Sequence, residues 1–500
     1  MVEKSVIIIG AGIAGLSTGC YAQMNGYHTR IFEMHDNPGG LCTAWQRKGY
    51  TVDGCLHWLM NSSPGSEMYR LWEELGVVQG QQIINMEQFY RVEGADGKVL
   101  TLYCDIDRLE QHMKKVAPED TRLISDCARA IRRFTRMNLP VLKAQELYSP
   151  LDGLKLMFKM LPFMGDLRRW GRISMKELAL RFRNPLLRDA WLNMWPPEFT
   201  ALFMLITLAT FHQKASGYPI GGSMQVSRAI EKRYLGLGGE IKYKSKVDKI
   251  IVENDRAVGV RLADGGEHRA DYVISAADGH ATIFDMLDGK YINDKIRGYY
   301  ESLPIFPPLV FVSLGVNRSF EELPKMISGL VLTLEKPVTI GGGERKWLYV
   351  RIHNFDPTLA PPGKTLLTIM MESNYPYWEA LHKDLARYKA EKEQIADTVV
   401  SLLDKRFPGL AAQVEMRDVA TPVTFHRYTG NWQGSFEGWL VTPKTLMLNM
   451  SKTLPGLDCF YMAGQWVAPG GGLPSGAMTG RYVTQMLCKR DKKRFAATTP

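Results

Sequence analysis

Cysteine is sparse in this chain, and its arrangement argues against both a disulfide framework and a structural zinc site. Seven cysteines occur among 500 residues, and no two of them form a CxxC pair. An odd number without such pairs is typical of a protein from a reducing compartment. The ten histidines show no metal-ligand spacing with the cysteines, so we expect no metal site.

Long apolar runs are also absent. No stretch of 18 uncharged apolar residues occurs, so the sequence predicts no transmembrane helix. The first residues lead directly into an apolar strand and contain no basic segment followed by an apolar one. That pattern argues against a secretory signal, and we expect a cytoplasmic protein.

Acidic residues are fewer than basic ones, and the formal net charge is +10. Nucleic acid and an anionic membrane surface both attract basic proteins, but no nucleic-acid recognition motif is present, so we expect no nucleic acid as a partner. The segment 154–173 mixes apolar residues with lysine and arginine, which favours a peripheral helix on a membrane. Pro162 and Gly165 interrupt its pattern. A helix packed on the protein with its lysines in water is the alternative.

The most informative feature that is present is a glycine-rich turn near residue 10. The apolar run Ser5–Ile9 is followed at once by a GxGxxG pattern, and Glu33 ends a second apolar strand 23 residues after Gly10. Such glycines permit a tight turn, a close pyrophosphate and a closely packed helix, and a carboxylate at about this distance accepts ribose hydroxyls. The pattern predicts a dinucleotide site formed by Gly10, Gly12, Ile13, Ala14, Gly15 and Glu33.

A second pair of glycines decides between cofactors. Gly39, Gly40 and Leu41 follow the predicted ribose-binding strand directly, and a glycine pair lets the backbone approach a second large part of the cofactor. This arrangement suits the long, extended FAD better than a nicotinamide cofactor.

The length predicts two or three domains in an α/β protein. We expect residues 1–60, 215–290 and 430–500 to form a discontinuous Rossmann-type FAD-binding domain, with a helix near 225–235 and strands at 240–243, 247–252, 257–263 and 270–277. Residues 61–214 and 300–429 are expected to form an inserted, mixed α+β substrate-binding domain. Its first part looks mainly helical, and its second part contains β-rich runs and one long helix over 378–407.

Four blocks of sequence resemble the FAD-dependent amine-oxidase-like superfamily. More narrowly, the chain is similar to the phytoene desaturase, carotenoid isomerase and retinol saturase group. The blocks lie at 6–33, at 39–40, at 217–224 with 238–247, and at 460–476. The last is the most specific, because a triple glycine between two prolines, before a closing helix, is typical of the carotenoid branch.

The resemblance implies further FAD contacts. They fall at Val247, Ala276, Gly464, Gln465, Gly472, Leu473 and Pro474. Gln465 departs from the family, in which many members carry an acidic residue, but an amide can still donate and accept hydrogen bonds there. No cysteine or histidine occupies a family position for covalent attachment, so non-covalent FAD is expected.

The function implied is desaturation, saturation or isomerisation of a polyene or isoprenoid lipid, in which FAD carries the redox chemistry. The partner would be a hydrophobic small molecule, and the oligomeric state stays open. A flavin amine oxidase and a non-enzymatic prenyl carrier of the Rab-escort type are the alternatives. Only His57 is a candidate for acid–base catalysis, and a packed histidine is the commoner role for such a residue.

Overall fold

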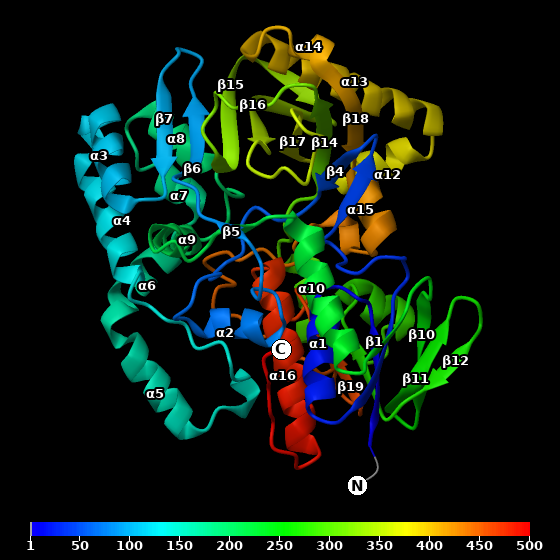
Figure 1. Ribbon diagram of the computed structural model, residues 1–500. Coiled ribbons are helices and arrows are strands. Elements are labelled where there is room, and N and C mark those ends of the chain that lie inside the picture. Colours follow the sequence, from blue (N-terminus) through cyan, green and yellow to red (C-terminus); the bar gives the residue numbers. More distant parts are fainter. Residues whose placement is uncertain (1–2) are drawn as a thin grey trace.

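Three distant parts of the chain form one parallel sheet in the computed structural model, which describes residues 3–500 (Figure 1). Its strand order is β19-β13-β1-β2-β9, and every neighbouring pair is parallel. The strands are β1 (Ser5–Ile9), β2 (His28–Phe32), β9 (Glu240–Lys242), β13 (Tyr272–Ser275) and β19 (Phe460–Met462). The chain therefore has the α/β, Rossmann-type architecture predicted from its sequence.

Both faces of this sheet are covered, as the unbroken apolar run of β1 predicts. Val6 and Ile8 pack against the helices, whereas Ile7 and Ile9 pack against a small antiparallel sheet. The helices are α1 (Ile13–Met24), α10 (Gly222–Gly236) and α16 (Gly472–Arg490), and the small sheet contains β10 (Val247–Glu253), β11 (Arg256–Leu262) and β12 (Glu267–Arg269). Alternation along the strand sends successive side chains to opposite faces.

A second, seven-stranded sheet lies at the other end of the molecule (Figure 1). Its order is β18-β14-β17-β16-β15-β6-β7, and only the β15–β6 pair is parallel. The strands are β6 (Gln88–Glu93), β7 (Val99–Tyr103), β14 (Leu309–Val316), β15 (Met326–Ile340), β16 (Gly343–Ile352), β17 (Thr365–Glu372) and β18 (Val414–Ala420). The β-rich runs predicted at 309–314, 348–352 and 365–371 are confirmed as β14, β16 and β17.

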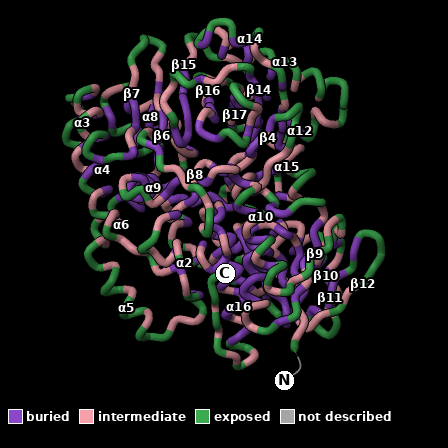
Figure 2. Tube along the Cα trace, viewed as in Figure 1, coloured by how far each residue is buried: buried purple, intermediate pink, exposed green. Residues whose placement is uncertain are grey.

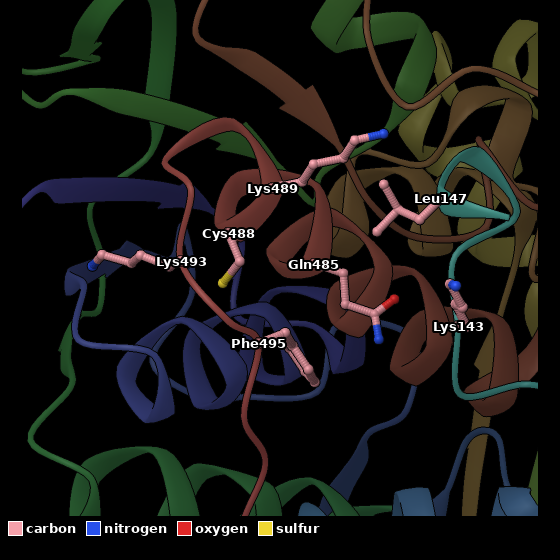
Figure 3. A pocket seen from close by; sticks show the side chains of 7 residues that line it. All are labelled: Lys143, Leu147, Gln485, Cys488, Lys489, Lys493 and Phe495. Carbon is pink, nitrogen blue, oxygen red and sulfur yellow. The ribbon is translucent and has the colours of Figure 1, made fainter. Parts of the chain in front are cut away.

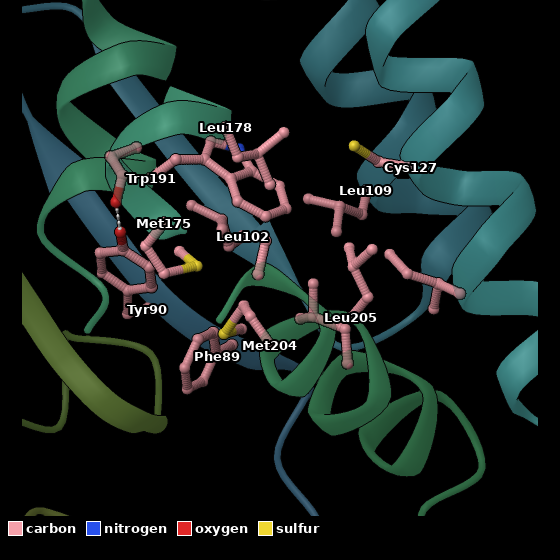
Figure 4. Packing of buried hydrophobic residues seen from close by; sticks show 14 of the residues in the cluster. Phe89, Tyr90, Leu102, Leu109, Cys127, Met175, Leu178, Trp191, Met204 and Leu205 are labelled. Carbon is pink, nitrogen blue, oxygen red and sulfur yellow. Dashed lines mark hydrogen bonds between the residues drawn. The ribbon is translucent and has the colours of Figure 1, made fainter. Parts of the chain in front are cut away.

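Helices from the middle of the chain pack beside this sheet around a large apolar core (Figure 4). They are α3 (Ile106–Val116), α4 (Thr121–Phe134), α7 (Met175–Ala179), α8 (Pro185–Leu192) and α9 (Ala201–His212). The mainly helical stretch 61–214 also supplies β6 and β7, which the sequence did not predict. They form a hairpin across a turn at Gly97, which has φ 77°.

The long helix predicted over 378–407 is wrong in one respect, because two helices occupy that region. They are α12 (Tyr375–His382) and α13 (Leu385–Arg406). The break lies at Asp384, whose side chain accepts hydrogen bonds from the backbone N–H groups of Ala386 and Arg387 at 3.1 Å each. An aspartate that caps a helix in this way begins a new helix.

The segment 154–173 also divides. The helix α5 (Pro150–Met160) ends in a 3₁₀ turn at Leu161–Phe163, and α6 (Met164–Gly171) follows. Pro162 lies in that turn, where it cannot donate the hydrogen bond that a continuous helix needs. No residue of α5 is buried, and Figure 2 shows its trace as exposed or intermediate throughout. Within residues 3–500, every helix is too short or too polar to cross a membrane.

Candidate functional site

The first glycine turn connects β1 to α1 in a space that admits no side chain. Gly10 has φ 93°, and a Cβ atom at Gly15 would lie 1.9 Å from the carbonyl oxygen of Gly10. Gly12 is the N-cap of α1, and no side chain caps that helix. The N–H groups of its first turn are therefore free of a side-chain acceptor, which is the arrangement that binds phosphate.

Glu33 stabilises the same turn from the end of β2. Its carboxylate is buried and accepts hydrogen bonds from the backbone N–H groups of Ala11, at 2.7 Å, and His35, at 2.9 Å. A carboxylate has about four acceptor positions, so positions remain for hydroxyl groups of a ligand.

The second glycine pair lies directly against the first turn. The N–H of Gly39 donates to the carbonyl of Ala11 at 2.9 Å, and a Cβ atom at Gly40 would lie 3.4 Å from the Cα of Gly12. Gly39 and Gly40 have φ values of 110° and 60°, which favour glycine. Leu41, which follows them, is partly exposed.

The C-terminal block joins these two turns from more than 400 residues away. A Cβ atom at Gly464 would lie 3.4 Å from the Cβ of Ala14, and one at Gly476 would lie 3.2 Å from a side-chain carbon of Ile13. Gly472 begins α16, whose N-cap is the uncapped Gly471 with φ 56°. Leu473 and Pro474 lie in the first turn of α16, where Leu473 is buried and Pro474 is half-buried.

Two further predicted contacts border the first turn. The carbonyl of Ala276 lies 3.5 Å from the position of a Cβ atom on Gly10. Val247 is buried at the start of β10, two residues after Ser245, whose N–H donates to the carbonyl of Glu33 at 2.8 Å. The structure thus brings the predicted residues of all four blocks to the same edge of the parallel sheet.

Gln465 faces the protein. Its amide nitrogen donates to Oδ1 of Asn431 at 3.2 Å, and the indole N–H of Trp466 donates to the same oxygen at 3.1 Å. The side chain also packs on Gly438, where a Cβ atom would lie 2.9 Å from its Cγ. Its amide therefore connects the C-terminal block to the segment 431–438.

His57 lies beyond the second glycine pair in the chain and contacts β15 and β16 of the seven-stranded sheet. Its Nδ1 atom is 3.3 Å from Oγ of Ser328, and its ring stacks on Tyr349 with 6.5 Å between centroids. Burial, and secondly the charge of Arg351, hold the pKa of His57 well below its usual range. The imidazole is therefore neutral near pH 7 and is a weak proton acceptor.

Sequence patterns missed Arg351, which is buried next to His57. Its guanidinium donates to the carbonyls of Leu56, at 2.6 Å, and His57, at 3.2 Å. Burial lowers the pKa of Arg351 from its usual value. The sequence does contain a signal for Arg351, which is the one arginine within the otherwise apolar run 347–352 of β16. A charged side chain is rarely buried unless it has a partner.

Aromatic rings extend from His57 into the helical core. Trp58 meets the edges or faces of three other rings, with centroid distances of 6.0 Å to Phe89, 5.2 Å to Phe211 and 6.2 Å to Trp195. Trp195 in turn stacks on Phe199 at 4.8 Å. This side of the site is lined by aromatic rings of the helical core.

A separate cavity of about 460 Å³ lies beside the C-terminal end of α16 (Figure 3). Its lining residues are Lys143, Leu147, Gln485, Cys488, Lys489, Lys493 and Phe495. None of the residues predicted to contact the cofactor lines this cavity, so the candidate site remains the edge where the glycine turns meet.

Comparison with known proteins gives one family and a consistent set of relatives. The family model described as flavin containing amine oxidoreductase matches residues 13–487. A chloroplastic prolycopene isomerase from Daucus carota is 25% identical, over 96% of this chain and 79% of its own length. A neurosporene-forming phytoene desaturase from Rhodobacter capsulatus is also 25% identical, over 96% of this chain and 93% of its own length.

Solved structures share the fold at lower identity. An oxidoreductase from Methanosarcina mazei superposes with a TM-score of 0.60 at 17% identity, covering 96% of this chain and all of its own. A triple mutant of putrescine oxidase, made in a redesign of cofactor binding, gives 0.62 at 14% identity, covering 98% of this chain and 99% of its own.

Proposed function

Because this chain belongs to the flavin containing amine oxidoreductase family, we propose that it is an FAD-dependent oxidoreductase that acts on carbon–carbon bonds of a polyene or isoprenoid lipid. The observation that carries the proposal is the meeting of three glycine-rich turns at one sheet edge, where added Cβ atoms would collide with backbone. The names of the relatives, prolycopene isomerase and phytoene desaturase, support a polyene substrate.

Different residues would hold different parts of FAD. The uncapped start of α1 would bind the pyrophosphate, and Glu33 the ribose. Gly39, Gly40 and the start of α16 would approach the rest of the molecule. The cofactor would be non-covalent. When bound, the flavin would supply two-electron chemistry at the substrate carbon.

The protein would bind and orient an apolar chain. The rings around Trp58 supply dispersion contacts and exclude water. The neutral imidazole of His57 would border the reacting part of the chain without adding charge. These features favour a lipid over an amine, which is the alternative substrate class for this fold.

An anionic membrane is the source that we propose for such a substrate. Leu151, Phe158 and Leu161 are 68%, 62% and 61% exposed on residues 150–171, which comprise α5, the 3₁₀ turn and α6 and are called the α5 segment below. Within residues 3–500, Lys155 and Arg168 on the same segment form no salt bridge. Exposed apolar side chains flanked by unpaired cations suit insertion at the surface of anionic lipid.

The absorption spectrum of the purified protein tests the proposal. We expect oxidised-flavin bands, and we expect the flavin to pass into the filtrate as FAD when the protein is denatured. For a desaturase, a polyene lipid should bleach these bands without oxygen. For a saturase or isomerase, turnover of the lipid should occur only after the flavin has been reduced. A colourless protein that FAD does not reconstitute would contradict the proposal. Bleaching by amines but by no lipid would favour the amine oxidase alternative.

A further inference from the structure

Two cysteines flank the hairpin that follows the second glycine pair. In the hairpin of β3 (Ala44–Arg47) and β4 (Tyr50–Asp53), Ala44 pairs with Asp53, and the N–H of Gly54 donates to the carbonyl of Thr43 at 3.0 Å. Continuing the same register by two residues beyond the strands places Cys42 opposite Cys55. Opposite residues of an antiparallel pair have Cβ atoms about 4.5–5.5 Å apart, and a disulfide needs about 3.5–4.5 Å. A small movement is therefore enough to join the two sulfurs.

The two cysteines lie near the same residue, Ser223. The sulfur of Cys42 is 3.5 Å from the carbonyl of Ser223, and the N–H of Leu56, which follows Cys55, donates to Oγ of Ser223 at 2.8 Å. The Cys42 thiol and burial both raise the pKa of Cys55, in that order of size. Cys42 is buried, whereas Cys55 is partly exposed and so partly accessible to an oxidant.

The pair lies beside the predicted flavin contacts. The N–H of Cys42 donates to the carbonyl of Gly39 at 3.0 Å. On the other side, the charge of Glu437 acts on Cys55, and Oε1 of Glu437 is 3.9 Å from the position of a Cβ atom on Gly472. Cys55 therefore lies between the second glycine turn and the start of α16.

We propose that Cys42 and Cys55 form a reversible dithiol–disulfide pair that exchanges two electrons with the flavin. The proposal rests on the proposed function, which supplies the flavin. On oxidation, both S–H bonds break and one S–S bond forms. Two electrons and one proton pass to the flavin, and the second proton passes to water. The reverse step returns two electrons and two protons to the sulfurs.

Glu437 is suited to return a proton to the sulfurs in the reverse step. Within residues 3–500, its carboxyl group has no hydrogen-bond or ion-pair partner, and burial raises its pKa to about 8. Glu437 is close enough to act on Cys55 electrostatically, and the carboxylate of Asp53 accepts from the N–H of Cys55 at 3.0 Å. A carboxyl group that keeps its proton near neutral pH can donate it when the disulfide is reduced.

Counting electrons tests the pair. The flavin-containing protein is treated with diamide, desalted and titrated with dithionite without oxygen. We expect about four electrons per flavin for the wild type, two for the flavin and two for the disulfide, and about two for Cys42→Ser and for Cys55→Ser. Cys488→Ser, which changes a cysteine beside the Figure 3 cavity, should still take up about four.

Alkylation of the denatured, diamide-treated wild type tests for the disulfide directly, without any substituted protein. We expect five of the seven cysteines to be modified, and a peptide pair joined between Cys42 and Cys55. A flavin-containing protein with seven reactive thiols and an uptake of two electrons would overturn the redox pair alone. A disulfide in a protein that cannot bind flavin would overturn both the electron transfer and the proposed function.

Discussion

Individual charged groups at this site are held in unusual states by their surroundings. Glu33 remains a buried acceptor because backbone N–H groups satisfy both of its oxygens. Among residues 3–500, no donor reaches the carboxyl group of Glu437, and burial raises its pKa to about 8. Two glutamates near one cofactor site therefore have different surroundings: Glu33 accepts backbone hydrogen bonds, whereas Glu437 keeps its proton near neutral pH.

Replacing Glu33 tests the ribose contact. Glu33→Ala removes an acceptor that would bind ribose hydroxyls and also frees two buried N–H groups. Hydrogen bonds to charged groups contribute about 1.5–3 kcal/mol each, so FAD affinity should fall at least about tenfold. Titration of the apoprotein with FAD measures it. The exposed Glu267→Ala should bind normally, and unchanged binding by Glu33→Ala would show that Glu33 does not contact the ribose.

The pH dependence of stability tests Glu437. Its folded-state pKa of about 8 lies above its ordinary value, so the folded protein keeps a proton that the unfolded chain releases. Stability should therefore fall as pH rises from about 4.5 to about 8. Thermal unfolding at pH 5 and pH 8.5 should show that Glu437→Gln gains stability relative to the wild type at the higher pH. An equal difference at both values would mean that Glu437 is ionised in the folded protein.

At the scale of elements, the breaks between consecutive helices determine which apolar surfaces are exposed. Asp384 ends one helix and starts the next, and Pro162 separates α5 from α6. The second break leaves α5 with no buried residue, although α5, the turn that follows it and the first residue of α6 together carry six large exposed apolar side chains. These are Leu151, Leu154, Met157, Phe158, Leu161 and Met164.

Charged substitutions on the α5 segment test its contact with lipid. Phe158→Glu with Leu161→Glu removes two apolar groups, each of which stabilises insertion by about 1.5–3 kcal/mol. Binding to liposomes that contain phosphatidylserine should fall at least about tenfold in a sedimentation assay. The control is Leu235→Glu with Leu385→Glu, two exposed leucines on other helices. Equal loss in both double variants would exclude a specific role for α5.

At the scale of the whole molecule, the cofactor site depends on chain segments that are far apart in sequence. The parallel sheet takes strands from residues 5–32, 240–275 and 460–462, and α16 packs on α1 through Gly476 and Gly480. A Cβ atom at Gly480 would lie 2.6 Å from the backbone nitrogen of Thr18. Binding at the edge of this sheet therefore stabilises the fold that joins all three segments.

Removal of FAD should lower the melting temperature. A ligand that binds only the folded chain stabilises it by about 2.7 kcal/mol at 100 times its Kd. Differential scanning fluorimetry of holoprotein, apoprotein and apoprotein with added FAD should show the loss and its recovery. For a chain of this size the expected shift is a few degrees. Identical transitions in all three samples would mean that FAD does not bind the folded protein.

The sequence by itself determined the parts of the site that depend on neighbours along the chain. The β1–α1 turn, the strand that ends at Glu33, the helix near 225–235 and the strands that follow it are all predicted by local patterns, because glycine spacing and apolar alternation act within a few residues. The β6–β7 hairpin and the break at Asp384 were missed, because the local sequence patterns there are weak. Packing determines the hairpin, and helix capping determines the break.

Only the tertiary structure decided which distant groups meet. Arg351 comes to lie on the carbonyls of Leu56 and His57, and Glu437 lies between Cys55 and Gly472. Nothing near these residues in the sequence marks them, because their chemistry depends on burial and on charges contributed by other segments. A local pattern can predict a cofactor turn, but the pKa of a carboxyl group is determined by whatever the fold packs around it.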